Sequence, residues 1–154
     1  MCKFVQITSK YINSVNRLYE KYTKYTEDDY NEDNLAGIIQ RTQPFFWVIL
    51  TINNDFAGFV YLDNIIGNSK KLHSAELTTC FERKFWGIYP KYCAKIFLKN
   101  CFDKYGFEKI KALIYPQNFR VKTLLKQSGF EKEALLKAET QKNGKPQDIE
   151  VYSL

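Results

Sequence analysis

Two runs of apolar, aromatic and β-branched residues near the middle of the chain, residues 45–52 and 56–62, constrain the fold more than any other feature. Residues of these types favour β-strands, because their side chains fit the pleated, half-buried surface of a sheet. Asn53, Asn54 and Asp55 separate the two runs, and they tolerate the left-handed backbone that tight turns require. The sequence therefore predicts a β-hairpin here.

Helical patterns lie on both sides of this hairpin. Apolar residues recur at helical spacing in four segments, which begin after Thr8 or Ser9, near Leu35, at Pro90 and after Asn118. Pro90 is favoured in the first turn of a helix, and Gly106 is expected to end the helix over 90–105. Asn118 is a good N-cap for a helix over 119–128.

Further strand patterns complete the order of elements. Strands are expected over residues 2–8, 74–81 and 109–115, and a polar loop over 65–72. A terminal hairpin is expected from 130–140 and 148–154, around the turn residues Asn143-Gly144. The resulting order, β-α-α-β-β-β-α-β-α-β-β, predicts one mixed α/β (α+β) domain over residues 1–154.

Composition narrows the class of protein. With 154 residues and 45% hydrophobic residues, the chain can build a core without disulfides or a structural metal. The four cysteines form no C-x-x-C pair, and the single His73 cannot complete a zinc site with them, so no metal is expected. The net charge of +6 favours polyanionic partners, but the lysines are spread along the chain, which disfavours nucleic acid. No apolar run reaches the length of a membrane span, and a cytoplasmic location is expected.

A more specific pattern covers residues 75–154. It consists of Glu76, Phe85-Trp86-Gly87, Asn118, Gly129-Phe130, Glu133, Asn143-Gly144, Asp148 and Tyr152. This pattern resembles the branch of the Gcn5-related N-acetyltransferases (GNAT) that acetylates the N-termini of ribosomal proteins. The resemblance implies a mixed sheet of about seven strands flanked by four helices. It also implies direct transfer of an acetyl group from acetyl-CoA to a primary amine, with no metal.

The acetyl-CoA loop departs from the pattern of that family. The family places Arg or Gln, two residues, Gly, one residue and then Gly or Ala where backbone N–H groups at a helix N-terminus hold the pyrophosphate. Here Tyr89 stands at the first small position and Lys91 at the second, and Pro90 has no N–H. Only Gly87 is retained.

Two interpretations of this loop remain open. In the first, the loop still binds acetyl-CoA, with charge from Arg83, Lys84, Lys91 or Lys95. The resemblance then implies a cofactor site formed by Phe81, Arg83, Trp86, Gly87, Ile88, Tyr89, Lys91 and Asn118. In the second, Tyr89 fills the phosphate site and the fold serves as a non-catalytic binding or assembly module, whose many aromatic residues suit a protein partner or a homodimer.

Candidates for the chemistry of transfer are few. Glu76 is the candidate general base, although a slip of one residue would point it to the other face of the sheet. Tyr152 is the second candidate, and His73 is the only imidazole available. The position at which some family members carry a tyrosine acid is Leu125 here. The acidic residues 27–33 lie where this fold meets its acceptor, so they could attract an amine.

Overall fold

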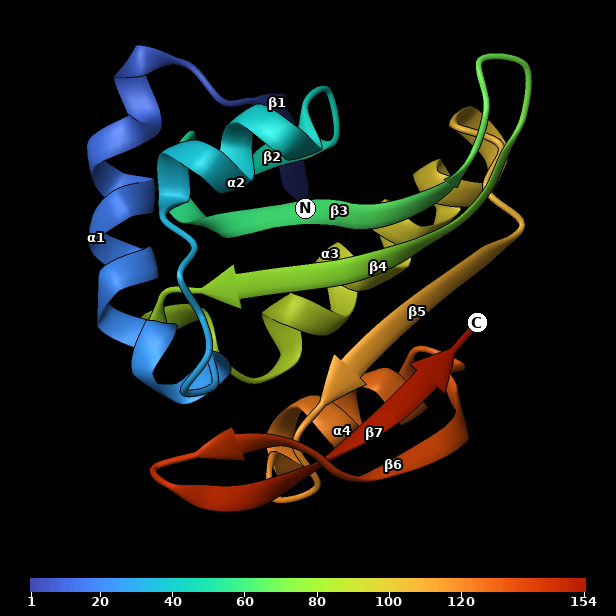
Figure 1. Cartoon of the computed structure of the whole chain (residues 1–154). Helices are drawn as coiled ribbons and strands as arrows, with labels where there is room; N and C mark the ends of the chain where they lie inside the picture. The colour runs from blue at the N-terminus through green and yellow to red at the C-terminus, as the bar shows by residue number, and fades with distance from the viewer.

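Seven strands form one mixed sheet in the order β1-β2-β3-β4-β5-β7-β6 (Figure 1). The computed structural model describes all 154 residues. The strands are β1 (Cys2–Gln6), β2 (Phe46–Thr51), β3 (Phe56–Gly67), β4 (Leu72–Phe81), β5 (Lys109–Ile114), β6 (Glu131–Lys142) and β7 (Lys145–Ser153). The helices are α1 (Ser9–Thr26), α2 (Leu35–Thr42), α3 (Ile88–Lys99) and α4 (Phe119–Gln127). The expected order of elements and the mixed sheet with four helices are confirmed.

Several boundaries differ from the sequence prediction. The loop expected over 65–72 is confined to residues 68–71, because Ile66 pairs with Ser74 and Gly67 with Leu72 in a long β3–β4 hairpin. The helix expected from Pro90 begins at Ile88, and after Lys99 it continues as a π-helical turn, Asn100–Lys104. The terminal hairpin is longer than expected, since β6 reaches Lys142 and β7 starts at Lys145.

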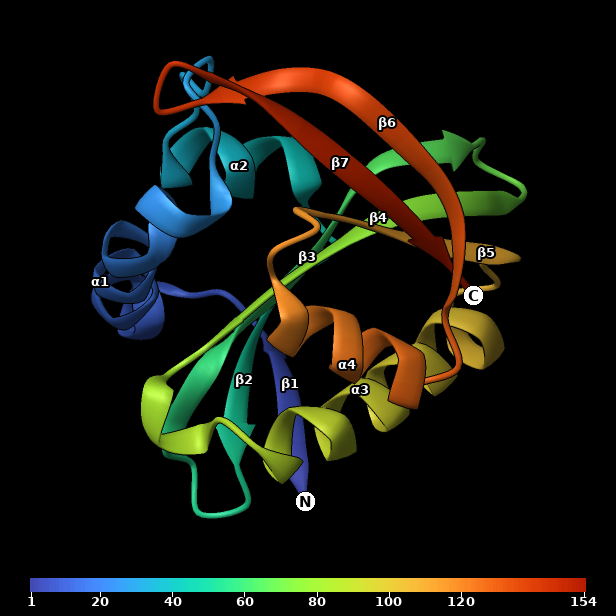
Figure 2. The same cartoon turned by 90° about the horizontal axis from the view of Figure 1, so that it is seen from below.

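The two faces of the sheet are covered by different helices, with α1 and α2 on one and α3 and α4 on the other (Figure 2). Alternate residues of β2 supply both cores, because successive strand side chains point to opposite faces. Val48 belongs to the nine-residue buried cluster that includes Val15 and Leu18 of α1. Ile49 belongs to the eighteen-residue cluster that includes Phe97 of α3.

The centre of the sheet opens where β4 and β5 run parallel. They pair only at Ser74–Lys109, Ala75–Ile110 and Glu76–Lys111. Beyond Glu76, β4 stays paired with β3 as far as Phe81, while β5 stays paired with β7 through Ile114. The two parallel strands therefore separate toward their C-terminal ends.

Candidate active site

Glu76 lies at the vertex where the two strands separate. It is the last residue of β4 that pairs with β5. Its carboxylate accepts a hydrogen bond of 2.8 Å from Asn64 Nδ2, and Lys111 Nζ lies 3.7 Å away. Glu76 shares a face with Thr78, which pairs with Tyr61 of the core under α1 and α2. The carboxylate is therefore presented at the opening, on the α1/α2 face.

Tyr152 lies on the opposite face. It pairs with Ala112 next to the Lys111–Ser153 pair, so its ring points to the α3/α4 side, where it is buried. Its hydroxyl donates to Glu150 Oε2 at 3.2 Å, and Lys122 and Lys132 bind the same carboxylate. Since Glu76 and Tyr152 are on different faces, the structure does not bring the two candidates together.

The remaining residues singled out in the sequence either contact other residues of the fold or lie in its core. His73 is exposed, and its Nδ1 lies 2.9 Å from Glu108 Oε2, at the end of β4 away from the opening. Asp148 accepts a hydrogen bond from the backbone N–H of Ala138 within the terminal hairpin. Leu125 is buried in the core. Asn118 caps α4 through its side-chain oxygen, which accepts from Val121 N.

The N-terminus of α3 carries open hydrogen-bond donors. Gly87 is the N-cap, with φ of 112° and ψ of −123°, a conformation that residues with a side chain rarely adopt. The backbone N–H groups of Gly87, Ile88 and Tyr89 make no hydrogen bond within the protein, and no side chain caps the helix. An added Cβ at Gly87 would meet nothing within 4 Å, so the backbone at the start of α3 is not crowded on that side. Such a helix terminus suits an anion.

Tyr89 does not cover these donors. Its ring turns into the protein. It packs edge-on against the ring of Phe81, with 6.3 Å between the ring centroids, and lies tilted against the ring of Phe85, with 5.2 Å between the centroids. Its hydroxyl is buried without a hydrogen-bond partner. The geometry therefore does not support the interpretation in which Tyr89 fills the phosphate site.

Trp86 instead covers the gap between the separated C-terminal ends of β4 and β5. Its indole Nε1 donates to the carbonyl oxygen of Phe81, the last residue of β4, at 3.0 Å. Its ring lies 5.8 Å from Tyr22 of α1 and 4.1 Å from the guanidinium carbon of Arg120 at the start of α4. The sequence alone does not indicate a role for Arg120, because its contact with Trp86 joins residues 34 positions apart.

A basic groove continues from the α3 N-terminus. It has a volume of about 500 Å³ and runs between α3, the end of α4 and the C-terminal Leu154. Lys91, Lys95 and Lys99 line it in one row, four residues apart, beside the exposed Ile88 and Tyr92. The lysine row therefore lines a cavity wide enough for a small ligand.

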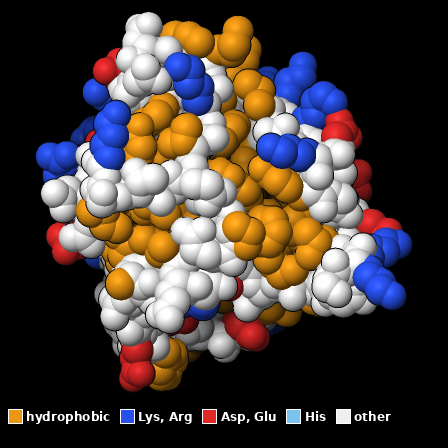
Figure 3. Space-filling view, turned by 90° about the horizontal axis from the view of Figure 1, so that it is seen from above, with side chains coloured by type: hydrophobic (Ala, Val, Ile, Leu, Met, Phe, Trp, Pro, Cys, Tyr) orange, Lys and Arg blue, Asp and Glu red, His pale blue; other side chains and the backbone are white.

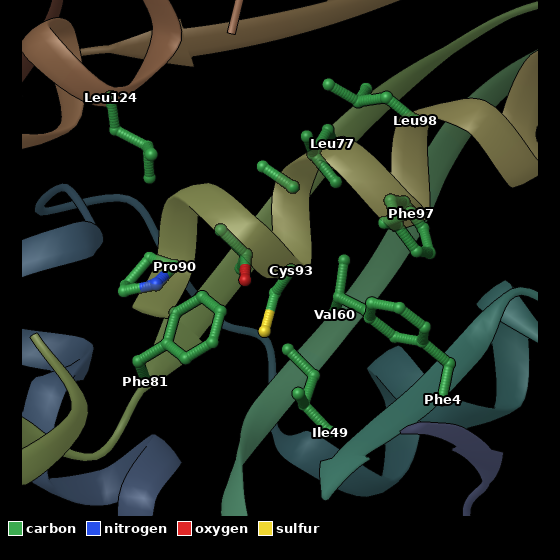
Figure 4. A pocket seen from close by; sticks show the side chains of 12 residues that line it. Phe4, Ile49, Val60, Leu77, Phe81, Pro90, Cys93, Phe97, Leu98 and Leu124 are labelled. Carbon is green, nitrogen blue, oxygen red and sulfur yellow. The ribbon is translucent and has the colours of Figure 1, made fainter. Parts of the chain in front are cut away.

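The sheet surface beneath α3 is filled. The cavity there measures only about 30 Å³ and is almost entirely apolar (Figure 4). Leu77 and Phe81 of β4, Cys93 of α3 and Leu124 of α4 line it. It has room for about one water molecule. Of the two cavities, only the basic groove has room for a ligand as large as a cofactor, and the gap between the strand ends is covered by Trp86.

On the α1/α2 face, the acidic connector docks onto the terminal hairpin. Figures 1 and 2 both show the tip of the β6–β7 hairpin against the segment between α1 and α2. Asp29 accepts hydrogen bonds of 2.8 Å from the backbone N–H groups of Asn143 and Gly144, and Asp28 accepts one from the Thr140 hydroxyl. The acidic connector therefore fastens the segment between α1 and α2 to the terminal hairpin. We call this set of hydrogen bonds, from Thr140, Asn143 and Gly144 to Asp28 and Asp29, the clasp.

Three ionisable side chains with raised pKa values, Glu27, Tyr61 and Tyr115, lie near the clasp. Burial raises the pKa of Glu27, and the neighbouring carboxylates of Asp33 and Asp28 raise it further. Burial also raises the pKa of Tyr61 and of Tyr115 to about 12 each, with a further contribution from the negative charge of Glu27. Tyr115 directly follows β5, so this negative region borders the open ends of the strands.

The remaining surface shows no single basic patch on the face seen from above. There the lysine and arginine side chains stand in separate groups around exposed hydrophobic ones (Figure 3). No group of three or more His, Cys, Asp or Glu side chains is arranged to hold a metal ion. No helix has both the length and the apolar character to cross a membrane.

Splayed parallel strands beside an open helix N-terminus are the cofactor-binding arrangement of the acyl-CoA-dependent acyltransferases. The chain belongs to the GNAT family: the model of the acetyltransferase (GNAT) domain matches residues 6–131. As a member of this family, the protein is an acetyl-CoA-dependent N-acetyltransferase. Family membership thus favours the enzyme over the non-catalytic module.

Solved structures share this fold over almost the whole chain. The chain is similar to the spermidine N-acetyltransferase from Vibrio cholerae in complex with CoA and spermine (16% identity, TM-score 0.81, 99% of this chain and 94% of that one). It is also similar to the ribosomal-protein-S5-alanine acetyltransferase from Vibrio fischeri (18%, 0.79, 99% and 92%). A GNAT-family acetyltransferase from Bacillus anthracis matches at 16% identity and a TM-score of 0.80, over 99% and 93%. No curated protein matches the chain.

Proposed function

We propose that the protein transfers the acetyl group of acetyl-CoA directly to a primary amine that approaches from the α1/α2 face. The observation that carries this proposal is the set of open N–H groups at Gly87, Ile88 and Tyr89, next to the separated ends of β4 and β5. These donors and the helix dipole suit a pyrophosphate, and Lys91 and Lys95 would add positive charge along the groove. Bound acetyl-CoA would supply the thioester carbonyl that the amine attacks; as the amide C–N bond forms, the C–S bond breaks and CoA leaves as its thiolate.

Two groups near the separated ends of β4 and β5 affect how the pantetheine arm of acetyl-CoA would bind. One would donate a hydrogen bond to the arm, and the other would have to move. Asn118 uses its side-chain oxygen as the helix cap, which leaves its Nδ2 free to donate to the pantetheine arm. The Phe81 carbonyl is the natural acceptor on β4 for the same arm, but Trp86 now occupies it. We infer that the Trp86 ring moves aside when the arm enters. Phe81 and Arg83 remain proposed contacts at this end of β4.

Glu76 is the proposed proton acceptor. It stands where the strands separate and faces the side from which the amine would come. Asn64 and Lys111 bind its carboxylate, which holds it in place. An amine must lose a proton as the new amide forms, and a carboxylate at the vertex can accept it directly or through water. The acceptor itself is an amine; spermine in the Vibrio cholerae complex is an example from a relative.

Calorimetric titration with acetyl-CoA tests the cofactor site. Binding is expected in the wild type. Gly87→Ala should weaken it roughly tenfold or more, because a side chain strains the backbone that aims the three donors. Gly106→Ala is the matched control, since Gly106 also has a positive φ of 78° and open space around it but lies beyond the far end of α3. Absence of heat with millimolar acetyl-CoA in the wild type contradicts the proposal.

A further inference from the structure

The side chain of Lys142, at the tip of the terminal hairpin, occupies a site built for an ammonium ion. Its Nζ donates to the backbone carbonyl oxygens of Lys24, at 3.1 Å, and of Glu27. The same Nζ lies 5.0 Å from the centroid of the Tyr115 ring. The lysine is half-buried and none of its contacts is a carboxylate ion pair.

Each wall of this site attracts positive charge. The two carbonyls belong to the C-terminal end of α1, where the last carbonyls of a helix lack intrahelical partners and the helix dipole is negative. The face of an aromatic ring attracts an ammonium by a cation–π interaction. Glu27 and Asp28 add negative charge that reaches the Tyr115 hydroxyl. A primary ammonium fits all three features, because it offers three donors and one positive charge.

The site also lies in a place that matters for the reaction. Tyr115 follows β5 at the open end of the splay, four residues beyond Lys111, which binds Glu76. At about 3.3 Å per residue, this separation corresponds to roughly 13 Å along the strand. A linear acceptor with several amines could place one nitrogen near Glu76 and another against Tyr115, whereas a small monoamine could not.

Resting on the proposed function, we infer that the Lys142 site is the subsite for a second ammonium group of a di- or polyamine acceptor. Lys142 is then an internal occupant that the acceptor displaces. Displacement is feasible because the occupant comes from a hairpin tip, while the carbonyls of α1 and the ring of Tyr115 form the permanent walls.

The first test uses chemical labelling of the wild-type protein without acetyl-CoA. An amine-reactive acetylating reagent is applied, and modification of Lys142 and Lys145 is measured by mass spectrometry in the same sample. Lys145 is an exposed lysine on the same hairpin and serves as the internal control. Spermine is expected to raise the ratio of Lys142 to Lys145 labelling several-fold above that in salt of equal ionic strength. An unchanged ratio overturns the inference.

The second test compares Lys142→Ala with Lys145→Ala by thermal unfolding, again without acetyl-CoA. Removing the internal ammonium should lower the Tm of Lys142→Ala, and 1,4-diaminobutane should restore part of that loss. Lys145→Ala should respond to the diamine no more than to matched salt. If Lys142→Ala shows no recovery beyond this control, the site is a structural contact only. Because neither test involves acetyl-CoA, failure here is distinct from failure of the proposed transferase reaction.

Discussion

At the scale of single residues, the proposed role of Glu76 as proton acceptor depends on its position in the sheet. The sequence identified this glutamate but left open which face of the sheet it occupies. Pairing with Asp63 on one side and Lys111 on the other determines that face. A carboxylate at the end of the last parallel pair is flanked on its C-terminal side by the opening rather than by a neighbouring strand, so a substrate can reach it.

Glu76→Gln should lower turnover by about 10²–10⁴-fold while leaving the affinity for acetyl-CoA unchanged, as expected when a general base is removed. The amide keeps the size of the side chain but accepts no proton. Glu108→Gln is the matched control, because Glu108 also binds two side chains, Lys71 and His73, but lies before β5, away from the opening. Steady-state kinetics with a panel of amines measure the effect. Equal turnover in the two variants assigns the proton to another group.

The residues that sequence analysis missed share one property. Arg120, Tyr115 and Lys142 acquire their roles from partners far along the chain, such as Trp86 and Lys24. Local periodicity carries no information about such pairs. The two interpretations of Tyr89 stayed open in the sequence for a related reason, since a motif alignment places its Cα but not the direction of its ring.

At the scale of elements, local patterns were sufficient for the order of strands and helices. Turn residues and helix caps marked most boundaries, and Asn118 and Asn143-Gly144 lie where expected. The outer part of the β3–β4 hairpin was not predicted, because Asn64 and residues 67–71 (Gly-Asn-Ser-Lys-Lys) interrupt the apolar pattern around Ile65, Ile66 and Leu72, and cross-strand pairing extends the strands there. The π-helical turn after α3 has no signal in the pattern that we could identify.

The packing of α4 on the terminal hairpin depends on Glu150. Burial alone would raise the pKa of this carboxyl, but hydrogen bonds from Lys122, Lys132 and Tyr152 outweigh it, and the pKa in the folded protein is lowered. An acid with a lowered folded pKa stabilises the fold above its unfolded pKa of about 4.3 and loses that stabilisation as pH falls through the folded value.

We therefore expect the free energy of unfolding of the wild type to fall as pH drops below about 5. Glu150→Gln should be less stable at neutral pH and should show a shallower decline in the same range. Chemical denaturation at a series of pH values measures both slopes. Parallel curves for the two proteins would show that the carboxyl contributes no pH-dependent stability.

At the scale of the whole molecule, the clasp joins the two halves of the chain. Asp28 and Asp29 belong to the segment before α2, and Thr140, Asn143 and Gly144 belong to the last hairpin. The clasp crosses the face on which the acceptor amine is proposed to bind, and it holds Lys142 at the end of α1. It thereby couples the shape of the acceptor side to the docking of the terminal hairpin.

Asp29→Ala should reduce the free energy of unfolding by about 1 kcal/mol, because two exposed charge-assisted hydrogen bonds to backbone N–H groups are lost. Glu32→Ala removes an acidic residue from the same connector without removing a clasp contact, and it should change stability little. Urea denaturation of both variants measures the difference. A loss of equal size in the two would mean that charge, rather than the clasp, is responsible.

The position of the clasp also predicts how it affects the folding and unfolding rates of the chain. Its hydrogen bonds link residues 112 to 115 positions apart, so closing them before either half is ordered carries a large loop entropy. We expect these contacts to be absent from the folding transition state and to form last. Weakening them would then leave the refolding rate nearly unchanged and speed the unfolding rate. We therefore expect the proposed acceptor side to be the last part of the molecule to assemble during folding and the first to open during unfolding.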